Sequence, residues 1–165
     1  GKQLSQMVTF VADTGNGRIA RFGLPGTAAS WNDAGVTGVA VNGSTVYTAD
    51  GGNVRPFDTG GNAGASWASA GAYGAAVDGS GNVWVSTTTG NLVNEYDAAG
   101  NFIQAVGSTA PVALSGPRGV AVGGGKVFVA DTGNKKIVRF DRDAQSYWVS
   151  RTPPGPPAES MSNQF

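Results

Sequence analysis

Three aspartates recur in one short phrase and are the first candidates for chemistry. Each begins an Asp-x-Gly-Asn turn, and the pairs are Asp13 with Asn16, Asp50 with Asn53, and Asp131 with Asn134. Three carboxylates at equivalent places could bind a metal ion or act as catalytic acids if they faced one another. An aspartate at the start of a tight turn instead accepts hydrogen bonds from backbone N–H groups two and three residues on, with glycine and asparagine in left-handed conformations. Because the phrase recurs, we interpret all six residues as turn-forming.

The other candidates for acid–base or metal chemistry are Asp78, Asn82, Glu95 and Asp97. Glu95 and Asp97 are two residues apart in an expected strand, so both side chains would project from the same face. Such a pair could serve as acid and base if buried together, but we interpret it as a polar strand end. Oxygen atoms of Asp78, Asn82 and Asp97 could bind calcium, although no segment concentrates acids as a calcium-binding loop does. We therefore predict no catalytic, cofactor-binding or metal-binding residue.

The chain contains neither cysteine nor histidine. Without cysteine there is no disulfide and no thiolate metal site. Without histidine the commonest general base and the commonest transition-metal ligand are missing. Any metal site would have to use hard oxygen ligands alone.

The aspartate phrases belong to an internal repeat. Val-Ala-Asp-Thr-Gly-Asn occurs at residues 11–16 and 129–134, followed by strands that end at Phe22 and Phe140. Two diverged copies lead to Phe57 and Tyr96, so the four aromatic residues are 35 to 44 residues apart. A period of this length is typical of solenoids and propellers. We expect the four aromatic rings to pack between adjacent repeats.

Each repeat is expected to form a small antiparallel sheet. Apolar runs opened by glycine lie at residues 38–41, 74–77 and 119–122, and turns rich in glycine and asparagine follow them. No segment has apolar residues at helical spacing. A fourth strand fits at residues 27–31, 65–70, 102–107 and 145–150. Four short strands in about 40 residues predict an all-β fold, a β-propeller or partial propeller of about four blades with four antiparallel strands each.

The last repeat resembles the NHL-repeat β-propeller family. The residues concerned are GPRGVAV at 116–122, VFVADTGN at 127–134 and IVRFD at 137–141. The resemblance covers about residues 8–150 and divides the chain into a lead-in (1–7), blades at about 8–33, 34–70, 71–113 and 114–150, and a proline-rich tail (151–165). Related lyases depend on histidines and lactonase-like propellers on calcium at the central channel. The expected channel strands here contain no charged residue, so no catalytic channel is predicted.

Charge and composition limit the partners. Eleven basic and eleven acidic residues give a formal net charge of zero. Basic residues gather in the last blade, but nearby aspartates offset them, so we predict no nucleic-acid binding. No run of apolar residues is long enough to span a membrane. Low charge, abundant small residues and the proline-rich tail favour an extracellular or periplasmic location.

Closure of the propeller is the remaining question. Nothing before residues 8–13 resembles the Gly-Val-Ala-Val strand, so the first blade is expected to lack its innermost strand. The chain would then form either a compressed four-bladed ring or an arc completed by another polypeptide or by another part of a longer protein, since unpaired strand edges promote association. The residues that we expect at such contacts are Val8, Trp31, Trp67, Phe140 and Trp148. For Trp31 and Trp67, packing against the neighbouring blade is the interpretation we favour over an exposed contact patch.

These features predict a non-enzymatic interaction or assembly module that associates with a protein partner or with itself, as a homo-oligomer or filament. The alternative is a propeller enzyme of the lactonase or lyase type with a calcium site built from oxygen ligands. A third possibility, an RNA-binding module, would need a clear positive surface.

Overall fold

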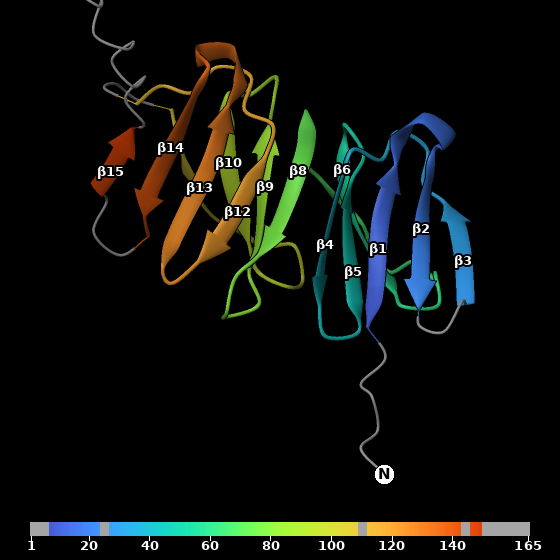
Figure 1. Ribbon diagram of the computed structural model, residues 1–165. Coiled ribbons are helices and arrows are strands. Elements are labelled where there is room, and N and C mark those ends of the chain that lie inside the picture. Colours follow the sequence, from blue (N-terminus) through green and yellow to red (C-terminus); the bar gives the residue numbers. More distant parts are fainter. Residues whose placement is uncertain (1–6, 24–26, 109–111, 143–145, 150–165) are drawn as a thin grey trace, which may run out of the picture.

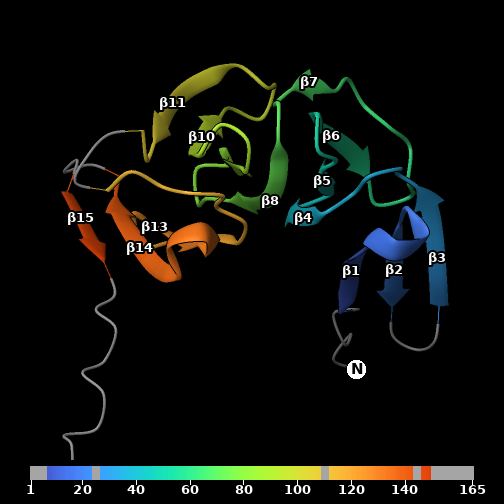
Figure 2. The ribbon, with the colours of Figure 1, turned by 90° about the horizontal axis from the view of Figure 1, so that it is seen from above.

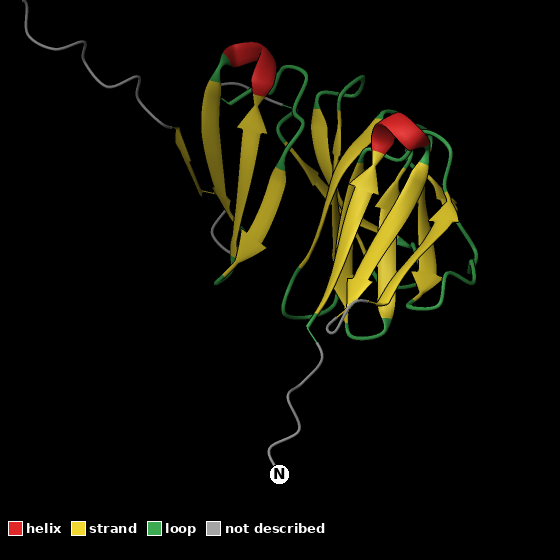
Figure 3. Ribbon diagram, turned by 45° about the vertical axis from the view of Figure 1, so that its right-hand side comes forward, coloured by secondary structure: helices red, strands yellow, loops and turns green. Residues whose placement is uncertain are grey.

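A computed structural model describes residues 7–23, 27–108, 112–142 and 146–149. The described part is almost entirely β-structure, as Figure 3 shows, and its helical segments are two single 3-10 turns, η1 (Thr14–Asn16) and η2 (Thr132–Asn134). No helix in these ranges has the length and apolar character needed to cross a membrane. The predicted tail at 151–165 and residues 1–6 of the lead-in lie outside the described residues.

Four antiparallel sheets follow one another along the chain, so the predicted all-β propeller architecture is confirmed (Figure 1). The first two sheets contain β1 (Val8–Asp13), β2 (Arg18–Gly23) and β3 (Thr27–Asn32), and then β4 (Gly38–Asn42), β5 (Thr45–Ala49), β6 (Asn53–Asp58) and β7 (Trp67–Ala68). The last two contain β8 (Ala72–Val77), β9 (Val83–Thr87), β10 (Leu92–Tyr96) and β11 (Phe102–Val106), and then β12 (Val120–Gly123), β13 (Lys126–Asp131), β14 (Lys136–Asp141) and β15 (Ser146–Val149). We call these sheets blades one to four.

Blade one has three strands, in the order β1-β2-β3, whereas each of the others has four. Among the described residues β1 therefore pairs only with β2, and its inner edge carries no strand. The blades form an open arc, with blade one and blade four at its two ends (Figure 2). The four blades therefore do not close into the compressed ring that was one of the two expectations (Figure 2).

The inner strands of neighbouring blades approach each other closely, and this explains the glycines that open the runs in blades two and three, Gly38 and Gly74, but not Gly119 of blade four. The hydroxyl of Thr37 donates a hydrogen bond to the carbonyl of Tyr73 at 2.7 Å, and Ser86 in β9 donates to the carbonyl of Arg118. A Cβ atom at Gly38 would lie 2.5 Å from the same Tyr73 oxygen. Side chains larger than hydrogen would therefore separate the blades at these points.

Two apolar clusters hold the arc together between its blades. Residues of blades two and three form the first, which contains Tyr47, Val54, Val83, Val85 and Tyr96. Blades three and four form the second, which contains Trp84, Val93, Val127, Val129 and Val138. Burial of this kind contributes about 25 cal/mol per Å² of apolar surface, so each blade is stabilised mainly by the blades beside it.

The fourth strand of blade two is much shorter than the expected range 65–70, because β7 contains only Trp67 and Ala68. Pro56 of β6 gives the reason. Its carbonyl accepts a hydrogen bond from Gly64, so this side of Pro56 faces the outer edge, where the missing proline N–H leaves a gap in the ladder. Pairing between β6 and β7 is limited to two residue pairs at the far end.

Candidate functional site

The two Asp-Thr-Gly-Asn turns form by a different mechanism from the predicted one. Both adopt a 3-10 turn without a side-chain cap, and the left-handed residue is the next one along, Gly17 or Lys135, not the asparagine. In the first turn the Asn16 amide donates to both carboxylate oxygens of Asp13 at 2.9 Å. Arg18 also donates to Asp13 at 2.7 Å. The asparagine thus holds the aspartate through its side chain, which fixes the turn without left-handed strain on the asparagine itself.

Asp131, in the equivalent turn of blade four, is completely buried. Its Oδ1 accepts the backbone N–H of Ser115 at 2.7 Å, and its Oδ2 accepts the Asn134 amide at 2.8 Å. Lys136 Nζ lies 3.7 Å from the same oxygen. Asp131 therefore joins blade four to the segment that enters it from blade three.

Asp50 alone of the three follows the predicted hydrogen-bonding mechanism, although the left-handed residue of its turn is Gly51 and neither Gly52 nor Asn53. Its Oδ1 accepts the backbone N–H groups of Gly52 and Asn53 at 3.2 and 2.7 Å. Arg55 forms an ion pair with its other oxygen at 3.2 Å. Blade two has no 3-10 turn here, so the aspartate reaches the backbone of its own turn.

A second family of turns was not recognised from the sequence, although its signal is plain: Asp-x-x-Gly-Asn. It occurs at residues 58–62, 78–82 and 97–101. In the last of these, Asp97 Oδ1 accepts the N–H groups of Ala99 and Asn101, the Asn101 amide donates to Oδ2 at 2.7 Å, and Gly100 has a φ of +89°. The Asn101 amide, its backbone N–H and two further N–H groups lower the pKa of Asp97 against a small effect of burial.

Glu95 and Asp97 do not form the carboxylate pair that their spacing allowed. Glu95 is completely buried and accepts hydrogen bonds from the amides of Asn82 and Gln104 at 2.8 and 2.6 Å. Asp97 lies beyond the end of β10, which has a register irregularity at Glu95 and Tyr96, and it turns into the outer loop. Alternation along a regular strand therefore does not extend to Asp97, and the two acids have separate partners.

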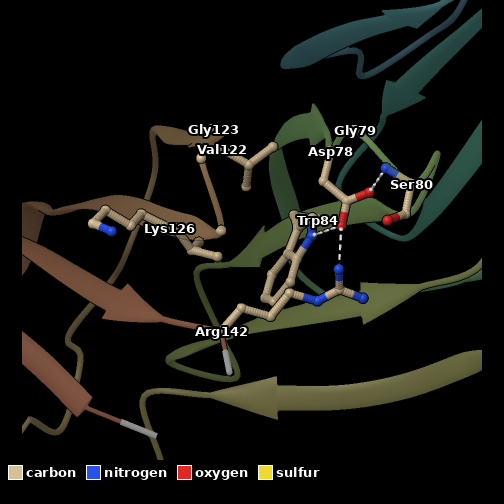
Figure 4. Close-up of a pocket in the computed structure, with 11 residues that line it drawn as sticks. Asp78, Gly79, Ser80, Trp84, Val122, Gly123, Lys126 and Arg142 are labelled. Carbon is tan, nitrogen blue, oxygen red and sulfur yellow. Dashed lines mark hydrogen bonds and ion pairs between the residues drawn. The ribbon is translucent and has the colours of Figure 1, made fainter. Parts of the chain in front are cut away.

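A polar cluster connects blades three and four beside a cavity of about 360 Å³. Arg142 donates to the buried Glu95 at 2.7 Å and lies 3.4 Å from Asp78 Oδ2. Trp84 Nε1 donates to that Asp78 oxygen at 3.1 Å (Figure 4). Burial alone would raise the pKa of Asp78, but hydrogen bonds from Trp84, Asn82 and Ser80, together with the charge of Arg142, lower it.

The cluster has the character of a structural joint, because its charged groups are matched to each other. Asp78 is held ionised, which does not suit a general acid at neutral pH. Among the described residues no three acidic side chains converge as metal ligands would. Two other basic residues of blade four also form ion pairs: Lys126 and Arg139 lie 3.8 and 3.2 Å from Asp141.

Asp33 differs from Asp78 and Asp97, because its surroundings oppose its charge. It is buried between blades one and two, and neither carboxylate oxygen has a hydrogen-bond partner in the described part of the chain. Arg55 Nε is 4.0 Å from Oδ1. Burial raises the pKa of Asp33, and this outweighs the nearby Thr48 hydroxyl and Arg55 charge, which lower it.

The tryptophans expected at contacts lie between blades. Trp31 packs between Phe10 and Phe57, with ring centroids 6.0 and 5.8 Å away. Trp67 packs between Tyr47 and Tyr96 in the same way. Within this chain both rings therefore serve packing between neighbouring blades.

The remaining expected contact residues are Val8, Phe140 and Trp148. Val8, half-buried, begins the unpaired edge of β1, and Phe140 packs against the cluster between blades three and four. Trp148 lies opposite Arg139 in the register of β15, and its side chain is outside the described part. A role in contacts with another chain stays a prediction for all three.

The two ends of the arc expose positions that the other blades bury. At the aromatic position, Phe57 and Tyr96 are 4% and 6% exposed, as expected of rings between blades, but Phe22 is 51% exposed. The prediction that Phe22 packs between blades is wrong for the described part of the chain, in which no blade lies against this face of blade one. On the same face of blade one, Val11 is 42% exposed, although Val85 at the same register position is completely buried. We call this face, formed by Thr9, Val11, Ala20 and Phe22, the leading face.

Blade four exposes its opposite face, which we call the trailing face and define by Ala121, Phe128 and Ile137. Phe128 is 40% exposed, whereas Tyr47 and Trp84, at the same position of blades two and three, are 3% and 1% exposed. In the closed part of the arc each trailing face packs against the leading face of the next blade. In the described part of the chain, blade one therefore exposes its leading face and blade four exposes its trailing face, and no other blade packs against either.

The comparisons with known proteins agree with this architecture. A model of the NHL repeat matches residues 114–140, which confirms the repeat type in blade four. No curated protein matches the sequence. A catalytically inactive virginiamycin B lyase from Staphylococcus aureus with quinupristin, in which a histidine is replaced by alanine, is 13% identical with a TM-score of 0.72, covering 93% of this chain and 58% of that one.

Two further solved structures are similar. The RRP9 WD40 repeats give 11% identity and a TM-score of 0.73, covering 90% of this chain and 52% of that one. The hydrazine synthase of Kuenenia stuttgartiensis gives 12% and 0.71, covering 86% and 46%. At such identities the likeness shows the β-propeller fold alone. The chain spans about half the length of these structures.

Proposed function

We propose that this chain is a non-enzymatic interaction and assembly module that associates with itself through the open ends of its arc. One observation carries the proposal: the leading and trailing faces expose Phe22, Val11 and Phe128 at positions that are buried wherever a neighbouring blade is present. Large apolar side chains grouped on such a face favour association. The inner edge of β1, which pairs with no strand among the described residues, adds backbone groups to which an extended strand could pair.

The charged groups support a binding module over an enzyme. The described acids at the cavity between blades three and four are engaged with Arg142, Trp84 and backbone N–H groups. The similar lyase structure with its histidine replaced is inactive, and this chain contains no histidine. A location outside the cytoplasm is part of the proposal and rests on the low charge and small-residue composition.

The alternative is a propeller enzyme of the lactonase or lyase type that binds calcium through oxygen ligands, and the fold of the lyase relatives favours it. Light scattering after size-exclusion chromatography, with calcium or with a chelator, tests the two together. We expect a mass above 16.6 kDa that increases with protein concentration and does not respond to calcium. A monomer that binds stoichiometric calcium and loses structure on chelation would contradict the proposal and support the enzyme.

A further inference from the structure

The internal contacts of the arc indicate how its two end faces can be satisfied. Between blades two and three, Tyr47 of the trailing face packs in one cluster with Val83 and Val85 of the leading face. In strand register, Phe128 of blade four corresponds to Tyr47, and Thr9 and Val11 of blade one correspond to Val83 and Val85. The free trailing face thus carries the aromatic partner that the free leading face lacks.

The leading face also has room for a partner. A shallow hollow of about 290 Å³ lies beside Phe22 and is bordered by the small residues Ala20, Ala28 and Ser30. At the corresponding aromatic of blade two, Phe57, the space is filled by Trp31 of the preceding blade. A blade packed against the leading face of blade one could therefore place a side chain in this hollow, as Trp31 of blade one packs against Phe57 of blade two.

We propose that two copies of this chain associate head to tail and close a two-copy ring. In this ring the trailing face of each copy packs against the leading face of the other copy. This rests on the proposed function and names its partner and contact. The ends of the arc do not meet within one chain (Figure 2), and the chain covers 52% and 58% of two single-chain propellers of the same fold. Two copies therefore supply about one full propeller, and a closed ring satisfies both end faces in each copy.

The competing arrangement is edge pairing, in which β1 of one copy adds to β1 of the other. It is symmetric, so Val11 would lie near Val11 of the partner copy. The head-to-tail ring brings Val11 near Phe128 and keeps the two Val11 residues apart. The difference can be measured directly because the chain has no cysteine of its own.

The test uses Val11→Cys and Phe128→Cys with a short bis-maleimide. The ring predicts a cross-linked dimer in the mixture of the two variants and little product from either variant alone. The double variant should stop at two copies. Phe128→Asp should shift the mass measured by light scattering from two copies to one, while Ile103→Asp, at an exposed position of the outer strand β11, should leave it unchanged.

Three outcomes overturn the ring. Cross-linking of Val11→Cys to itself would indicate edge pairing and would leave the proposed self-association in place. A ladder of products from the double variant would indicate an open filament, with the same consequence. A monomer at every concentration would overturn both the ring and the proposed self-association, so the two failures are distinguishable. The circular dichroism spectrum of each variant, recorded well below its melting temperature, should match that of the parent chain, which separates lost association from lost folding. A lower melting temperature of Phe128→Asp is expected from lost association itself.

Discussion

The indole ring of Trp67 in blade two lies directly against the α-carbon of Gly100 in blade three. A Cβ atom at Gly100 would be 2.5 Å from Cδ2 of Trp67. Trp31 of blade one has the same relationship to Gly61 of blade two, where the distance would be 2.8 Å. Each glycine follows an aspartate by three residues in an Asp-x-x-Gly-Asn turn. In both cases, therefore, the turn of one blade packs against the tryptophan of the blade before it.

Gly100→Ala should therefore destabilise the chain for two reasons. A left-handed φ costs a non-glycine residue about 1 to 2 kcal/mol, and overlap with Trp67 adds about 1 to 3 kcal/mol. Gly81→Ala is the matched control, because Gly81 has a φ of +87° in the same type of turn and its Cβ would approach only the Asn42 amide, at 3.2 Å. Urea unfolding should show a clearly larger loss for Gly100→Ala. Equal losses would mean that the Trp67 contact contributes nothing.

The joint between blades three and four gives a second prediction. Arg142→Met leaves the buried Glu95 carboxylate with two amide donors and no opposite charge. Removing one partner of a buried ion pair typically costs about 3 kcal/mol. Lys126→Met is the control, because its ion pair with Asp141 is long, at 3.8 Å, and the Lys126 side chain is 44% exposed, so the pair should be worth about 0 to 1 kcal/mol.

A double-mutant cycle completes that test. Glu95→Gln combined with Arg142→Met should be less destabilised than the sum of the two single changes, because the combined variant no longer leaves a charged Glu95 buried without Arg142. The loss of Arg142 beside Asp78 is common to the single and the combined variant. Strict additivity in the denaturant midpoints would show that Glu95 and Arg142 do not act as a pair.

How far the sequence predicts this molecule depends on the range of the interaction. Strands and hairpin turns follow from alternation and from glycine positions near one another in the chain, and the burial of Phe57 and Tyr96 follows from the repeat. Phe22 occupies the same repeat position but is exposed, because its burial requires a blade that precedes blade one. Periodicity identifies a position and cannot identify the neighbour in space.

Polar contacts between blades were beyond sequence reasoning for a related reason. Arg142 and Glu95 are far apart in the chain, and nothing in their local context indicates that β10 and the end of β14 bring them together. The Asp-x-x-Gly-Asn turns, by contrast, are local and could have been found by comparing residues 58–62, 78–82 and 97–101. The missed signal was a spacing of four residues between aspartate and asparagine.

The outer turns predict a loss of stability in acid. Hydrogen bonds from Asn101 and from neighbouring N–H groups hold the pKa of Asp97 below its usual value of 3.8. The ionised form is therefore favoured by folding, and its contribution is present above pH 3.8 and disappears as the pH falls through the folded-state pKa. Asp97→Asn should lower the melting temperature at pH 7 and have little effect near pH 2. An equal effect at both values would argue against the carboxylate charge as the cause.

Asp33 should behave in the opposite way. Burial raises its pKa above 3.8, and its carboxylate oxygens lack hydrogen-bond partners within the described ranges. The protonated form is thus favoured by folding, so the contribution of Asp33 is fully present below pH 3.8 and is lost as the pH rises through the folded-state pKa. Asp33→Asn removes the buried charge and should stabilise the chain at pH 7 by about 1 to 3 kcal/mol, with the gain shrinking as the pH approaches 3.8.

Denaturant unfolding from pH 3.5 to 8 measures the difference. The control is Asp58→Asn, in an exposed outer turn where the Asn62 amide lowers the pKa of the aspartate. This change should alter stability with the opposite sign. A destabilised Asp33→Asn at neutral pH would show that the Arg55 charge, 4.0 Å away, outweighs the cost of burial.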